Sequence, residues 1–427
     1  MGRVVMGRVV MGRVVMGRIK ELDGLRALAI ISVLAAHFAP SNTSLTNFLR
    51  LGWTGVDLFF AISGFLITGI LIGLRHKDGA FRTFYCRRTL RIFPPYYVAF
   101  GLILALALVH KERLNFREII PHALFLSSAK PGLIQLAVRR LLFPQPAAQL
   151  GTLKHIEYSV LQFKDCLGIY WSLSVEELFY LVWAPVMLKG SRRMILLCSV
   201  APLLVCPLLR GLAHMTPHID ESVGFIFRFD SLAAGSCVAL ALWGVEHGWV
   251  NRKASDQVLT SGIIVFPLAL IALPAVCGVH RGVDVRTTWA FSVFGFSLLA
   301  GSCASFVGAL ARWGAELGYV SHVLRSKAAS YLGRISYSIY LIHLPTYLVV
   351  QLLIVRWIAP EAIALSPTLV IVAGGLAMVG AILFAGLSWQ YIEAPIQEWK
   401  DELFPARSTE LPLAVGSDVD RSDPLCA

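Results

Sequence analysis

A histidine and an aspartate stand inside long apolar segments of the sequence, where ionisable side chains are rare. His37 lies in the segment 25–40, and Asp57 lies near the start of the segment 53–74. If the two segments cross a membrane in opposite directions as helices, both side chains lie in its outer half at nearly the same depth. A carboxylate that accepts a hydrogen bond from one imidazole nitrogen leaves the other nitrogen free as a base. The pattern predicts a histidine general base oriented by an aspartate; the alternative is two separate packing residues.

Two adjacent carboxylates form a second candidate site. Glu176 and Glu177 follow the start of the apolar segment 171–189, just inside its predicted outer end. Neighbouring residues on a helix point about 100° apart, so at most one of them can face a shared cavity squarely. We predict that Glu177 takes part in catalysis and that Glu176 contacts the substrate, with interfacial capping as the alternative for one of them.

Three further ionisable residues are predicted to bind the substrate. Arg228 and Asp230 begin the segment 224–244 at the same outer level, where the alternative is that they neutralise each other. His343 lies near the middle of the segment 331–355. An imidazole that faces lipid is costly, so His343 is expected to line a cavity.

Arginines gather at the opposite, cytoplasmic level. Arg88 and Arg91 lie one helical turn apart before the segment 94–110, and Arg26 lies near the inner end of its own segment. The guanidinium fork matches the geometry of phosphate oxygens, so these three residues could hold a phosphorylated ligand. The alternative is that they only anchor the cytoplasmic side of the protein by their positive charge.

The composition requires a membrane around these residues. Hydrophobic residues make up 56% of the 427 residues and charged residues only 15%. Because a soluble domain has about 25% charged residues, an ordinary soluble enzyme is excluded. The formal net charge is +12, but the basic residues stand in short runs between apolar segments, where they set orientation in the membrane. Nucleic acid is therefore not an expected partner.

The apolar segments predict an all-α fold, a polytopic transmembrane helical bundle of about ten spans. Each segment is long enough to cross about 30 Å of hydrocarbon as a helix. Lys and Arg concentrate in the loops expected inside the cell, so both termini are predicted to be cytoplasmic. The predicted spans are 25–40, 53–74, 94–110, 171–189, 193–210, 224–244, 258–279, 288–310, 331–355 and 365–390.

The sequence divides into three regions. Residues 1–22 are a basic start with a reiterated MGRVV pentamer, 23–397 form the membrane domain, and 398–427 are a polar tail predicted to be disordered. Within the domain, the apolar stretch 118–128 is too short to cross and is predicted to be interfacial or re-entrant. The eight cysteines lack C-x-x-C spacing, and no metal site is predicted.

Taken together, these segments resemble the acyltransferase-3 family of membrane O-acyltransferases, which modify cell-surface polysaccharides, lipid-linked sugars and some glycosides. The family's arginine–ten residues–histidine pattern falls on Arg26 and His37, and its R-x-x-R pattern falls on Arg88 and Arg91. Leu178 is a departure, since the family more often has glutamine there. The resemblance rests on DGLRALAIISVLAAH (23–37), GWTGVDLFFAISGFLIT (52–68), RRTLRIFPPYY (87–97), YWSLSVEELFYL (170–181), FRFDSLAAG (227–235), LGRISYSIYLIHLP (332–345) and SWQYIEAPI (388–396).

The resemblance implies a multi-pass enzyme of the cell membrane that transfers an acyl group, expected to be acetyl. It implies acyl-CoA as cytoplasmic co-substrate, no bound cofactor, and an extracytoplasmic carbohydrate or glycoside as acceptor. Arg26, Arg88 and Arg91 would hold the donor phosphates, while His37 would activate the acceptor hydroxyl or carry the acyl group itself. The alternative from another class is a transporter or flippase whose buried charges couple to protons. The sequence sets neither the acceptor nor the oligomeric state.

Overall fold

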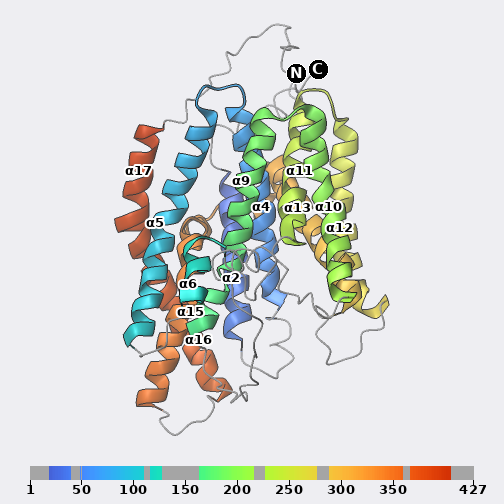
Figure 1. Cartoon of the computed structure of the whole chain (residues 1–427). Helices are drawn as coiled ribbons and strands as arrows, with labels where there is room; N and C mark the ends of the chain where they lie inside the picture. The colour runs from blue at the N-terminus through green and yellow to red at the C-terminus, as the bar shows by residue number, and fades with distance from the viewer. Residues whose placement is uncertain are drawn as a thin grey trace, which may run out of the picture.

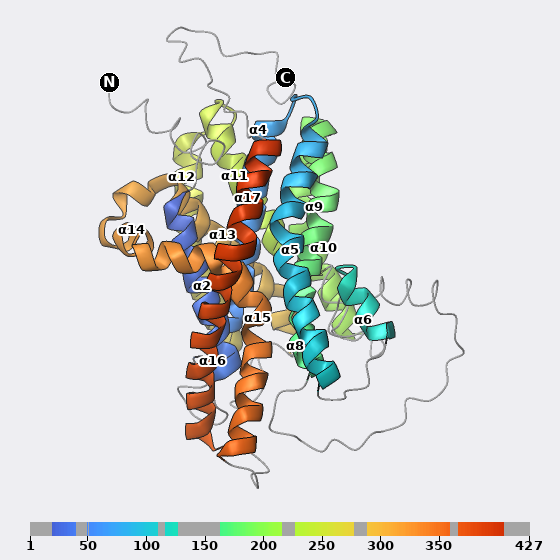
Figure 2. The ribbon, with the colours of Figure 1, turned by 90° about the vertical axis from the view of Figure 1, so that its left-hand side faces the viewer.

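The computed structural model describes residues 19–39, 49, 51–109, 116–126, 163–215, 227–276, 288–358 and 366–404. Every regular element in these ranges is helical, which confirms the predicted all-α fold. Long helices pack side by side in one bundle (Figures 1 and 2). Residues 398–403, at the start of the tail predicted to be disordered, belong instead to a helix, Ala394–Leu403. The reiterated start and the tail beyond residue 404 lie outside the described residues.

The helices follow one another along the chain with short connections where the structure describes them. Two π-helical turns continue directly into α-helices: η4 precedes α13, and η6 joins α16 to α17. The elements are α2 (Lys20–Phe38), η1 (Leu51–Thr54), α4 (Gly55–Leu74), α5 (Ala80–Val109), α6 (Phe116–Ala123), α8 (Phe163–Gly168), α9 (Trp171–Lys189), α10 (Arg192–Met215), α11 (Phe229–Glu246), α12 (Arg252–Val276), η4 (Phe291–Gly295), α13 (Phe296–Trp313), η5 (Gly314–Glu316), α14 (Gly318–Leu324), α15 (Lys327–Trp357), α16 (Pro367–Ser388), η6 (Trp389–Glu393) and α17 (Ala394–Leu403).

Each of the ten predicted spans coincides with one of these helices over most of its length. Among the described residues, eight helical segments are long and apolar enough to cross a membrane. The other two are α2 and α9, which have 19 residues each and carry charged side chains into the bundle. A helix of that length rises about 28 Å, enough to reach across hydrocarbon. The number of crossings in a cell remains a prediction.

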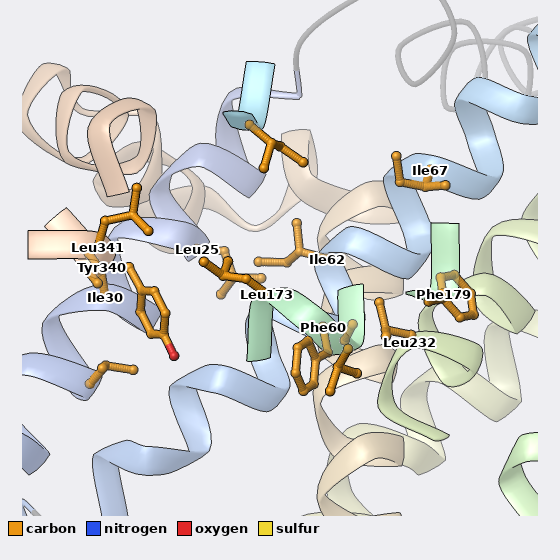
Figure 3. Packing of buried hydrophobic residues seen from close by; sticks show 14 of the residues in the cluster. Leu25, Ile30, Phe60, Ile62, Ile67, Leu173, Phe179, Leu232, Tyr340 and Leu341 are labelled. Carbon is orange, nitrogen blue, oxygen red and sulfur yellow. The ribbon is translucent and has the colours of Figure 1, made fainter. Parts of the chain in front are cut away.

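Small residues bring the central helices close together. Gly64 on α4 lies against the backbone of Leu232, and Gly235 on α11 lies against the backbone of Ala61, so a Cβ atom at either glycine would collide with the facing helix. Close approach at small residues is a common way for helices to associate in membranes. Around this contact, apolar side chains from α2, α4, α9, α11 and α15 form one cluster, part of which Figure 3 shows.

Three basic connections lie at the same end of the bundle. They join α4 to α5, α9 to α10 and α11 to α12, and both ribbon views place them together (Figures 1 and 2). All three belong to loops that the sequence predicts to be cytoplasmic. The shared end supports the predicted alternation of the spans, while its side in a cell remains a prediction.

The apolar stretch 118–128 forms no crossing helix. Its helix α6 has only eight residues and rises about 12 Å. It packs beside α5, where the hydroxyl of Tyr96 donates to the carbonyl of His122 at 2.6 Å. The hydroxyl of Tyr97 donates to the next carbonyl, that of Ala123, at 2.9 Å.

Candidate active site

A cavity opens between α2, α4, α5, α9 and α15. It encloses about 780 Å³ that protein atoms do not fill, including its open mouth. Apolar and hydroxyl side chains form much of its wall, among them Phe60, Tyr337 and Tyr340. Its charged lining residues are Arg26, Arg88, Arg91, Glu176, Glu177 and Arg334.

The structure brings the predicted arginines and glutamates into contact. Nη2 of Arg88 lies 3.4 Å from Oε2 of Glu176, and its Nε lies 3.9 Å from Oε1 of Glu177. The prediction that carboxylates and arginines occupy opposite membrane levels is therefore wrong. Helix α5 begins at Ala80, well before the predicted span, so Arg88 stands two turns inside a helix and its long side chain reaches α9.

The two glutamates differ in the number of hydrogen bonds that they accept. Glu176 accepts hydrogen bonds from the hydroxyls of Ser63 at 3.1 Å and Tyr180 at 2.8 Å, in addition to its contact with Arg88. Glu177 makes no hydrogen bond with any residue that the structure describes. Its oxygen atoms are therefore the more available of the two for a ligand in the cavity.

The two predicted histidines form a pair between α2 and α15. Nε2 of His343 lies 3.3 Å from Nδ1 of His37, and the ring centroids are 5.0 Å apart. Nδ1 of His343 lies 2.7 Å from the carbonyl oxygen of Tyr340, and Nδ1 of His37 lies 3.0 Å from that of Val33. His343 is fully buried, whereas His37 is exposed.

These contacts fix the hydrogen positions of the neutral pair. A carbonyl oxygen only accepts, so Nδ1 of His343 carries its hydrogen and Nε2 of that ring is an acceptor. Both neighbours of Nδ1 of His37, the Val33 carbonyl and His343, are then acceptors, so this nitrogen is the protonated one. Nε2 of His37 keeps its lone pair and makes no hydrogen bond within the described part of the chain.

The predicted contact between His37 and Asp57 is wrong. The carboxylate of Asp57 is fully buried and forms an ion pair with Arg228, and it also accepts from the hydroxyl of Ser231 at 2.8 Å. Both partners come from the start of α11. Asp57 on α4 points toward α11, whereas His37 on α2 faces α15.

Arg228 and Asp230 do not neutralise each other. Arg228 pairs with Asp57 and stacks over the ring of Phe296 at 4.1 Å, whereas Asp230 lies 2.8 Å from Nη2 of Arg210. Neither residue lines the cavity. Arg210 was missed by the sequence analysis, although an arginine at the end of an apolar span was a signal for a buried partner.

Two residues of the cavity were also missed. Arg334 stands on α15 in the motif that carries His343, and its guanidinium lies 5.5 Å from the ring centroid of Trp389. Tyr340 follows it on the same helix, and its hydroxyl lies 2.7 Å from that of Ser172. The spacing of three residues between Tyr340 and His343 was the available signal, since it places both on one helix face.

His37 and His343 are not among the residues that line the cavity, contrary to the prediction for His343; the lining residue Tyr340 connects it to them, with its ring centroid 5.7 Å from that of His343. A cavity with arginines and glutamates and a nearby histidine pair, inside a helical membrane bundle, is suited to acid–base chemistry on a phosphorylated ligand. The chain belongs to the acyltransferase-3 family: the profile of this family, described as an acyltransferase domain, matches residues 19–386. No solved structure matches the chain significantly.

Curated relatives agree with this membership. YrhL of Bacillus subtilis is 26% identical over 393 residues, which cover 88% of this chain and 54% of YrhL. The peptidoglycan O-acetyltransferase OatA of Listeria monocytogenes is 26% identical over 407 residues, covering 89% of this chain and 56% of OatA. The O-acetyltransferase OatA of Staphylococcus aureus is 25% identical over 388 residues, covering 88% of this chain and 57% of that protein. The chain thus spans little more than half the length of these relatives.

Proposed function

We propose that this chain is a multi-pass O-acyltransferase of the cell membrane, which moves an acetyl group from cytoplasmic acyl-CoA to a hydroxyl of an extracytoplasmic carbohydrate or glycoside. Family membership supports the reaction class, and the names of the two OatA relatives support acetyl as the group. The peptidoglycan named for the Listeria relative is a carbohydrate polymer of the proposed acceptor class.

The observation that carries the proposal is the shared layout of α2 and α15. These helices run in parallel, since Gly333 lies against Asp23 near their starts and His343 meets His37 further along, and each has an arginine before its histidine. Arg26 and His37 are separated by about 16 Å of helix, and Arg334 and His343 by about 13 Å. A donor with its phosphates at the arginine end would direct its acyl-pantetheine arm along both helices toward the histidines.

The donor's place in the cavity follows from charge. The sequence predicts Arg26, Arg88 and Arg91 at this end as donor ligands, and a guanidinium group that is free of carboxylates can bind phosphate oxygens through two parallel hydrogen bonds. The acyl-CoA is a co-substrate that leaves as free CoA, and the proposal includes no bound cofactor. The lipid bilayer surrounds the site and keeps bulk water from the thioester.

His37 acts as the general base. The free lone pair on its Nε2 takes the proton of the acceptor hydroxyl, whose oxygen attacks the thioester carbonyl carbon. The carbonyl then re-forms as the carbon–sulfur bond breaks, and the CoA sulfur receives the proton from the His37 imidazolium. Glu177 lines the same cavity, and its oxygens can accept a hydrogen bond from a hydroxyl of a bound sugar. An acyl-histidine intermediate is the variant in which His37 attacks first.

His343 takes the positioning role that the sequence analysis gave to Asp57. Its acceptor nitrogen holds the Nδ1 hydrogen of His37, so the reactive nitrogen points away from the pair. As His37 becomes an imidazolium, the same contact shares the new positive charge with a neutral ring. Asp57, Arg228 and Asp230 are then expected to act through stability rather than through contact with the substrate.

The experiment that tests the proposal is acyl transfer by the purified protein in detergent. With acetyl-CoA and a soluble peptidoglycan fragment or glycoside, an acyltransferase releases free CoA without any ion gradient. A transporter or flippase does not release CoA under these conditions, so its absence over a panel of acceptors would favour that class. Mass spectrometry of surface glycans from a deletion strain would identify the acceptor and the acyl group.

A further inference from the structure

Arg88 is flanked by two carboxylates and an aromatic ring, although its buried Nε has no hydrogen-bond partner in the described structure. Its guanidinium lies 3.4 Å from Glu176 and 3.9 Å from Glu177, and it stacks over the ring of Tyr180 at 3.9 Å. Tyr180 in turn donates to Glu176. Only 17% of the Arg88 side chain is exposed. A phosphate that bound Arg88 would have to displace two carboxylates and approach their negative charge.

Two other arginines of the cavity, Arg91 and Arg334, make no hydrogen bond or ion pair with the described residues. Arg91 follows Arg88 by one turn on α5, is exposed, and makes neither a hydrogen bond nor an ion pair with the described residues. Arg334 approaches the same cavity from α15 and is also exposed. Its described contact is the stacking over Trp389, which leaves the guanidinium edges open to a ligand.

The charge of the cavity defines what it can bind. Arg88 is matched by the two glutamates, and Arg26 lies 3.7 Å from Asp23. The guanidinium groups of Arg91 and Arg334 have no carboxylate within ion-pair distance among the described residues. With Asp23 included, the four arginines and three carboxylates give the cavity a formal charge of +1. Two open guanidinium forks suit a doubly charged phosphate group, such as the diphosphate of a coenzyme A thioester.

We propose that the R-x-x-R arginines have separate roles: Arg91 acts with Arg334 to bind the diphosphate of the donor, whereas Arg88 is a positioning residue for the glutamates. The proposal rests on the proposed function, because it names ligands for that donor. Arg88, Ser63 and Tyr180 all contact Glu176. By holding Glu176 in place, Arg88 also sets the direction of the neighbouring Glu177, which lines the cavity.

Ligand binding tests the arginine pair without requiring transfer. The binding of CoA and of pyrophosphate to the purified protein in phosphatidylcholine nanodiscs is measured for wild type and for Arg88→Lys, Arg91→Lys and Arg334→Lys. Lysine keeps the charge but loses the fork, so we expect about tenfold weaker binding for Arg91→Lys and Arg334→Lys. Arg88→Lys should bind both ligands within about twofold of wild type. Arg87→Lys is the matched control, because Arg87 pairs with Asp401 outside the cavity.

Turnover tests the positioning role. Arg88→Lys should lower kcat at saturating donor with little change in the KM for acetyl-CoA, while Arg91→Lys should do the reverse. In a Glu176→Gln background, Arg88→Lys should cost much less additional activity, because the carboxylate that it holds is gone. Equal loss in both backgrounds, or CoA binding weakened as much by Arg88→Lys as by Arg91→Lys, would overturn the assignment.

The outcomes for wild type separate the two proposals. Binding of pyrophosphate without CoA would contradict the donor in the proposed function but support the anion site. If wild type binds neither ligand, the anion site is overturned, and acyl transfer is judged by its own assay. If phosphatidylglycerol in the nanodiscs competes at Arg91 and Arg334 and pyrophosphate does not, the pair binds lipid phosphate and the donor assignment is wrong.

Discussion

The buried ring of His343 contacts the exposed ring of His37, with its Nε2 atom 3.3 Å from Nδ1 of His37. The buried ring is fixed by the carbonyl of Tyr340 one turn earlier on the same helix. Because α2 and α15 pack along much of their length, the two rings are held by the helices themselves rather than by a loop. The pair has the arrangement of a base and the group that orients it.

Replacement of His37 by alanine should abolish transfer. The loss of a general base lowers rates by a factor on the order of 10²–10⁴. Because the ring is exposed, the variant should insert and fold like wild type, which size-exclusion chromatography in detergent checks. Near-normal release of CoA by folded His37→Ala protein would contradict the assignment of the base.

Two substitutions of His343 test whether its ring positions His37 or only fills space in the core. Glutamine at this position can still accept the Nδ1 hydrogen of His37 through its amide oxygen, while alanine cannot. We therefore expect His343→Gln to keep more activity than His343→Ala when both are equally folded. ¹⁵N spectra of the ring in bilayers should show His37 protonated at Nδ1 in wild type and a mixture of tautomers in His343→Ala. An unchanged tautomer in the alanine variant would argue against a positioning role.

The helices were predictable because their signal is local. A run of apolar residues long enough to cross a membrane specifies a helix without reference to the rest of the chain, and every predicted span overlaps a helix. The depth of a residue follows equally simply from the rise of 1.5 Å per residue. On this basis His37 was predicted in the outer half of the membrane and His343 near its middle, whereas the contact of the two rings puts them at one level.

The partners of these residues were not predictable, since they depend on how each helix is rotated and which helix it faces. Ser63 and Glu176, or His37 and His343, meet across large separations in sequence. Asp57 and His37 were predicted at one depth, but Gly52 lies against the backbone of Ser32, so Asp57 packs opposite an earlier part of α2. The long side chain of Arg88 adds a further uncertainty, because it reaches across levels that its backbone position keeps apart.

Replacement of Asp57 by alanine should destabilise the protein. It leaves Arg228 buried without its partner, which costs about 3–5 kcal/mol for a buried pair. The matched control is Asp256→Ala, which breaks a partly exposed ion pair with Arg312 and should cost about 1 kcal/mol or less. Thermal unfolding in detergent compares the two variants. A strong loss of activity in Asp57→Ala at unchanged stability would restore a direct catalytic role for Asp57.

Orientation in the membrane can be tested at the basic connections. In a background without native cysteines, single cysteines at Asp78, Ser191 and Asn251 should escape an impermeant thiol reagent in intact cells and react after permeabilisation. Ile358 follows the opposite end of α15 and is 66% exposed, so a cysteine there should react in intact cells. The reverse pattern would place the arginine end of the cavity outside and remove its access to cytoplasmic CoA.

The contact between α4 and α11 should tolerate no larger side chain at Gly64. A side chain on this glycine meets backbone atoms around Leu232, which cannot move aside as a flexible side chain could. Gly64→Val should therefore lower the thermal stability strongly, because α4 and α11 must separate and their buried contacts are lost. Gly101 on α5 has open space where a Cβ atom would stand, with no neighbouring atom within 4 Å, so Gly101→Ala should be neutral or slightly stabilising. Because Asp57 on α4 pairs with Arg228 next to α11, separation of the helices would also strain that ion pair. Gly64→Val with wild-type stability would show that the helices pack less closely in the membrane than they do here.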